Sequence, residues 1–93
     1  MERWQLNELA VLHWRQWGDE WVIFDESSAQ TLVADALMAA SLMALESGPL
    51  SLPEIETQVR ADLQWPEAEV LVPHVMTGLK FLSGLGLVRV ETR

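Results

Sequence analysis

Residues 12–25 read LHWRQWGDEWVIFD, two runs of aromatic and β-branched residues separated by Gly18-Asp19. This pattern is typical of a β-hairpin with a two-residue turn, in which the glycine takes a positive φ. Such a turn also predicts the register, with Trp14 opposite Ile23 on one face of the hairpin. The first third of the chain is therefore predicted to be rich in strands.

A third strand is predicted over Ala29–Val33, after the polar break Asp25–Ser28. In a three-stranded meander this strand lies at an edge. Residues 30–33 contain no proline and no charged residue, the usual devices that block an edge. An open edge can bind a foreign peptide as an added strand, but short edges are also left unguarded without any such role. The residues alone leave both interpretations open.

The rest of the chain is predicted to be helical. Asp35 is a suitable N-cap for a first helix, which ends before Gly48-Pro49. Residues 51–54 form a capping box that opens a second helix. A third helix is expected to begin near Pro66-Glu67, with Pro73 about two turns in, where it would kink the helix.

Gly84-Leu85-Gly86 ends the third helix, and Leu87–Val90 is predicted to add a short final strand. The predicted fold is α+β and winged-helix-like: a three-stranded antiparallel sheet followed by three helices (β-β-β-α-α-α), with a short C-terminal strand. Residues 1–93 are expected to form a single domain. The core stripe of the third helix is predicted to be Ala68, Leu71, Val75, Leu79 and Leu82.

The third helix carries an additional apolar flank. Val72 and Met76 lie beside the core stripe, with Lys80 beyond them. Methionine adapts to varied partners, so this flank can line a groove. The alternative is that both residues pack against another helix.

Composition narrows the class of partner. The chain has 93 residues, 49% of them hydrophobic, with no cysteine and a net charge of −8 from 14 acidic and 6 basic residues. The absence of cysteine excludes disulfides and thiolate metal sites. The negative charge disfavours nucleic acid and anionic membranes and favours a neutral or basic peptide. With no signal peptide and no apolar stretch of about 18 residues, a soluble cytoplasmic protein is expected.

Catalytic and metal motifs are not found. His13 and His74 are the only histidines, and neither has a second ligand at metal spacing. A Gly-x-Ser-x-Gly nucleophile motif does not occur. We therefore expect a non-enzymatic protein with no catalytic residue, metal or cofactor.

Four parts of the chain together resemble a known family: residues 14–25, residues 28–31, Gly48-Pro49 before the capped second helix, and residues 81–88. They are similar to the PqqD-like peptide chaperones, also called RiPP recognition elements, and in particular to the branch named the HPr-rel-A system. The resemblance covers roughly residues 10–90. This chain departs from the branch at Ala29, where glycine is usual, and at Leu32, where histidine is frequent.

The resemblance implies a function in natural product biosynthesis. Members of the family bind the leader of a ribosomally made precursor peptide as an extra strand beside the third strand, pack it against the third helix and present it to a modifying enzyme. Carried onto this chain, the expected peptide-binding residues are Gln30, Thr31, Leu32, Val33, Val72, Met76, Leu79 and Lys80.

Two other functions fit the same predicted elements. A winged-helix DNA-binding regulator has a similar element order, although only Lys80 of the six basic residues lies in the third helix. A structural interaction subunit is the other, such as a homodimer joined through the hairpin that bears Trp14, Trp17 and Trp21. These tryptophans also suit a small core, and whichever of Trp17 and Trp21 points away from the helices is the candidate for a partner surface.

Overall fold

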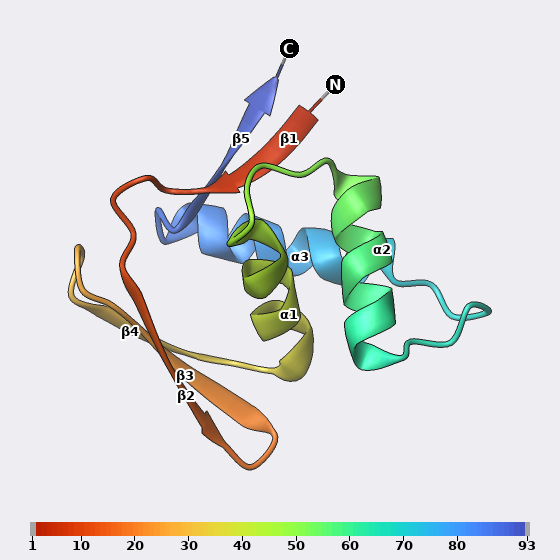
Figure 1. Ribbon diagram of the computed structural model, residues 1–93, viewed down its shortest axis with the longest axis horizontal. Coiled ribbons are helices and arrows are strands. Elements are labelled where there is room, and N and C mark those ends of the chain that lie inside the picture. Colours follow the sequence, from red (N-terminus) through yellow and green to blue (C-terminus); the bar gives the residue numbers. More distant parts are fainter. Residues whose placement is uncertain (1, 93) are drawn as a thin grey trace.

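The computed structural model describes residues 2–92 and shows an α+β fold (Figure 1). A three-stranded sheet lies on one side of the first helix, and the second and third helices lie on its other sides. A two-stranded ribbon brings the two ends of the chain together. The elements are β1 Glu2–Leu6, β2 Leu12–Trp17, β3 Glu20–Asp25, β4 Gln30–Ala34, α1 Ala36–Leu45, α2 Leu52–Leu63, α3 Val72–Gly84 and β5 Val88–Thr92.

The larger sheet is the predicted antiparallel meander, in the order β2-β3-β4. Its hairpin turns at Gly18, which has the expected positive φ of 62°. Trp14 lies opposite Ile23 and Gln16 opposite Trp21, so the predicted register is confirmed. The third strand begins one residue later than expected and lies at an edge of this sheet, as predicted.

The two faces of this sheet have different surroundings. Ile23, Leu32 and Ala34 point toward the helices and are buried, in line with the two-residue period of a strand. The helices complete the core from their apolar faces. The large, fully buried hydrophobic side chains are Ile23, Leu42, Ile55, Val59, Leu71, Val75, Leu79, Leu82 and Leu87.

The first two helices begin at the predicted caps. The Asp35 carboxylate accepts a hydrogen bond from the Met38 N–H at 2.8 Å. Ser51 and Glu54 form the complete capping box, each side chain bonding the backbone of the other. The bonds from the Ser51 N–H and hydroxyl hold the pKa of Glu54 below its usual value. Helix α2 ends at Gln64, which adopts the left-handed conformation.

The third helix begins later than the sequence predicted. It starts at Val72, so Pro73 lies in the first turn and does not kink the helix. A proline costs roughly 3 kcal/mol inside a helix but little in the first turn, where its missing N–H has no partner to lose. Residues 64–71 instead form a loop, in which Ala68 is exposed and does not belong to the core. The expected start at Pro66-Glu67 was therefore wrong.

The C-terminal strand β5 is present, and its partner is a strand that the prediction missed. Strand β1 pairs with β5 in antiparallel register, with Trp4 opposite Val90. Trp4 is buried and its backbone exchanges hydrogen bonds with Leu50, which fixes the ribbon to the start of α2. In residues 2–92, no helix is both long enough and apolar enough to cross a membrane.

Candidate functional site

The outer edge of β4 is an unpaired backbone edge. In a hairpin with a two-residue turn, Trp17 and Glu20 form the hydrogen-bonded pair next to the turn. Hydrogen-bonded and non-bonded pairs then alternate along the ladder. The bond from the Glu26 N–H to the Val11 carbonyl, at 2.9 Å, agrees with this phase. The backbone groups of Ile23 therefore point at β4 and not at β2.

This phase determines which groups of β4 are free. Leu32, which lies opposite Ile23, directs its N–H and C=O toward β3. Thr31 and Val33 must then direct theirs away from the sheet. Within the described residues, no strand pairs with this edge and no backbone hydrogen bond reaches Thr31 or Val33 from outside the sheet. An added strand would find two donors and two acceptors here.

A groove of about 440 Å³ adjoins this edge and lies between β4, α1 and α3. Phe81, which is 51% exposed, is its most exposed apolar wall on the helical side, and Val33 borders it from the free edge of β4. Gly78 also lines the groove and contributes no side chain to it. The lining residues are Val33, Asp35, Leu37, Met38, Ser41, His74, Thr77, Gly78 and Phe81.

Most polar groups of the groove are already satisfied within the protein. The Ser41 hydroxyl donates to the Leu37 carbonyl at 2.9 Å, and the Thr77 hydroxyl donates to the Pro73 carbonyl at 2.9 Å. The Asp35 carboxylate uses one oxygen to cap α1. The surface offered to a ligand is therefore mainly apolar, with the Asp35 carboxylate and the His74 imidazole as its other polar groups.

The two ends of the groove are set by other contacts. At one end, the Gln30 side-chain amide donates to the Leu85 carbonyl at 2.9 Å and so ties the start of β4 to the end of α3. At the other, the ring of His74 lies 6.2 Å from that of Trp65, in the loop before α3. The free edge of β4 and this groove are together called the slot; Gln30 ties β4 to the end of α3, and His74 lines the groove.

The sequence-predicted residues on β4 have different environments. Thr31 and Val33 are exposed on the free edge. Leu32 is buried in the core, so it supports the strand from behind. Gln30 is half-buried and engaged with Leu85, as described above. Of the predicted set, Val33 alone also lines the groove.

The predicted helical wall lies on the other flank of α3. Val72, Met76, Leu79 and Lys80 do not line the groove. Leu79 is fully buried, and Met76 is half-buried against the core. The sequence correctly predicted an apolar flank at Val72 and Met76, but it could not show that this flank packs against the core. The flank that faces the groove carries Gly78 and Phe81 instead.

The turn that leads into β4 is tightly bonded. The buried Asp25 carboxylate accepts hydrogen bonds from the Ser28 hydroxyl at 2.7 Å and from the Val11 N–H at 3.0 Å, as well as from Ser27. Burial opposes ionisation, but these bonds outweigh it and lower the pKa of Asp25. Ala29 follows with a φ of 58°, in the left-handed region that favours glycine.

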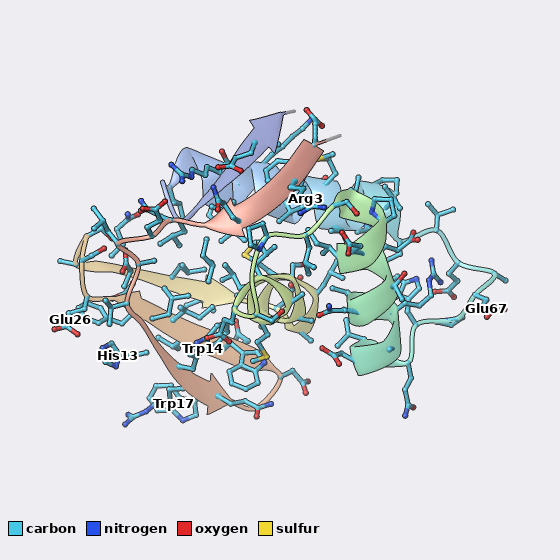
Figure 2. The ribbon with its side chains drawn as sticks, turned by 45° about the horizontal axis from the view of Figure 1, so that its top comes forward. Arg3, His13, Trp14, Trp17, Glu26 and Glu67 are labelled. Carbon is cyan, nitrogen blue, oxygen red and sulfur yellow. The ribbon has the colours of Figure 1, made fainter. Side chains whose placement is uncertain are left out.

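The hairpin tryptophans separate into two groups. Trp14 and Trp21 pack edge to face, with ring centroids 5.8 Å apart, against the core. Trp17 is 70% exposed and lies on the far side of the hairpin from the helices (Figure 2). Phe24 and Val33 share this outer sheet face. Trp17 is thus the tryptophan that points away from the helices.

Side chains that could hold a metal are not grouped anywhere in the part of the chain that the structure describes, since no three His, Asp or Glu residues come together. His13 forms a hydrogen bond with Glu26 at 2.9 Å on the surface, whereas His74 lines the groove, so the two histidines lie in different parts of the structure. The slot beside β4 is the candidate binding site, because it joins an unpaired strand edge to a groove. No family model, curated protein or solved structure matches this chain, so the comparisons assign it to no family.

Proposed function

We propose that this protein binds an extended peptide as a fourth strand on the free edge of β4 and presents it to a modifying enzyme. The observation that carries the proposal is the position of the unpaired edge directly beside an apolar groove. Backbone bonds to Thr31 and Val33 supply affinity that does not depend on sequence, and the groove supplies side-chain selectivity. The resemblance to the PqqD-like peptide chaperones supports the same function.

Charge defines the class of peptide. The chain carries a net charge of −8, and the lining of the groove includes the Asp35 carboxylate and the His74 imidazole. Opposite charge accelerates association and suppresses anionic competitors. The proposed client is accordingly a neutral or basic segment, such as the leader of a ribosomally made precursor peptide.

The proposed role is that of an adaptor. Ser41 and Thr77 line the groove together with His74, but both hydroxyls donate to backbone carbonyls and neither is hydrogen-bonded to the imidazole in the described residues, so no activated nucleophile supports a catalytic role. The chemistry on the peptide is assigned to a separate enzyme, which would act on the part of the client that extends beyond the slot.

The test is a selection followed by NMR mapping. Dodecapeptides from a phage-displayed random library are selected on the immobilised protein, and a selected peptide is titrated while backbone amide shifts are recorded. The expected shifts are in Thr31 and Val33 on the strand and in His74, Thr77 and Phe81 on the helix. Shifts confined to β2 and absent from Thr31 and Val33, or a failure to select any peptide, would contradict the proposal.

A further inference from the structure

Gly78 occupies a position in α3 where glycine lowers the stability of the helix. It lies in the middle of the helix, between Val72 and Gly84. Glycine destabilises a helix interior relative to alanine, because the unfolded chain loses more freedom on folding. A glycine at such a position therefore calls for a local reason.

The fold itself supplies no reason. Gly18, Gly48 and Gly86 have positive φ values, which explain their identity, but Gly78 does not. Close packing does not explain it either, because a Cβ placed on Gly78 would meet no heavy atom within 4 Å. The space beside Gly78 is the groove, so the missing side chain leaves depth for a ligand.

We propose that Gly78 is a specificity-determining residue, which admits one large apolar side chain of the bound peptide. This inference rests on the proposed function, and it names the class of client. The client is an extended, neutral or basic peptide with Leu, Ile, Met or Phe at the position over Gly78. Side chains alternate along a strand, so the neighbouring peptide residues point away from that position.

The chemistry around Gly78 favours such a side chain. Phe81 remains 51% exposed beside Gly78 in the groove, and a large apolar side chain over Gly78 would remove part of this ring from water. The hydroxyls of Ser41 and Thr77 donate to backbone carbonyls of their own helices, so they can only accept hydrogen bonds from a ligand and offer it no donor. A small apolar residue would leave the depth over Gly78 unfilled.

The test fills the space beside Gly78 with a larger side chain. The same phage-displayed dodecapeptide library is selected on the wild-type protein, on Gly78→Leu and on Gly84→Leu. Gly84 is the matched control, because it is the other glycine of α3, its added Cβ also meets nothing within 4 Å, and it does not line the groove. Gly78→Ala is a milder second variant, expected to raise the Tm by about 4–8 °C through helix propensity.

The wild type and Gly84→Leu are expected to select peptides with a large apolar residue at one fixed position. Gly78→Leu is expected to select Gly, Ala or Ser there and to bind the wild-type peptide about 5- to 150-fold more weakly, the effect of overpacking. If Gly78→Leu selects the same large residue with unchanged affinity, Gly78 does not set specificity, although peptide binding stands. If the wild type selects no peptide, the proposed function fails and this inference fails with it.

Discussion

Replacing Thr31 with proline removes one backbone N–H from the outer edge of β4. The alternation of the ladder places this N–H away from β3, so no bond within the sheet is lost. Proline is tolerated at such edge positions, and the Thr31 side chain is exposed and lies outside the groove. We expect a cost in folding free energy below about 1 kcal/mol.

Binding is expected to suffer more than folding. In the complex, the peptide carbonyl that faces Thr31 would lose its donor and remain unsatisfied. An orphaned acceptor of this kind costs about 1–3 kcal/mol, which corresponds to a 5- to 150-fold increase in Kd. The assay is fluorescence anisotropy with a labelled, library-selected peptide, together with urea denaturation of each variant.

Two further proline variants serve as controls. Gln16→Pro removes an N–H that points outward from the opposite edge of the sheet, so binding should be unchanged. Leu32→Pro removes an N–H that bonds β3 and should prevent folding. If Thr31→Pro remains folded and binds the peptide as tightly as the wild type, the pairing of a peptide with this edge is refuted.

Three other substitutions test neighbouring features. Ala29→Gly should stabilise the protein by about 1 kcal/mol in thermal denaturation, because Ala29 has a φ of 58°; an unchanged or lower Tm would contradict this. Asp35→Asn keeps the helix cap and should leave the Tm unchanged, while the affinity for a basic peptide falls by up to about fivefold in low-salt calorimetry. The control, Asp35→Ala, should lower both this affinity and the Tm. Asp25→Asn should cost about 1–3 kcal/mol at neutral pH in urea denaturation. Because the pKa of Asp25 is lowered by folding, this stabilisation is present above about pH 3.9 and is lost as the pH falls through the lower folded value, so a difference that persists at low pH would contradict the assignment.

The parts of the fold with local signals could be predicted from the sequence. Gly18-Asp19 determines a two-residue turn, which in turn determines the register of the hairpin. Asp35 and the Ser51–Glu54 box mark helix starts through bonds made within one turn. The edge position of β4 also followed, because successive short strands pair as a meander.

The errors arose where contacts between separate elements decide the structure. Strand β1 is short and marginal by itself, and it forms because β5, over eighty residues away, pairs with it. The loop before α3 is held by Arg60, whose guanidinium donates to the Pro66 carbonyl at 2.8 Å. Neither contact leaves a pattern in the neighbouring residues.

The candidate site was located in part. Its strand could be predicted, because an unguarded edge is visible in the residues of β4. Its helical wall could not, because periodicity gives the core stripe of α3 two flanks and does not tell which of them the rest of the core covers. The sequence did contain one signal for the groove-facing flank, a glycine in the middle of the helix. Gly78 lowers helix stability relative to alanine, and nothing within the fold requires a glycine there.

Amide hydrogen exchange at Thr31 and Val33 measures most directly whether a peptide occupies the edge of β4. In the free protein both amides should exchange rapidly, whereas the amide of Leu32 should be protected by β3. On addition of a library-selected peptide, protection should appear at Thr31 and Val33 and not at the outward amides of β2. Saturating peptide that leaves both amides in rapid exchange would contradict strand addition at this edge.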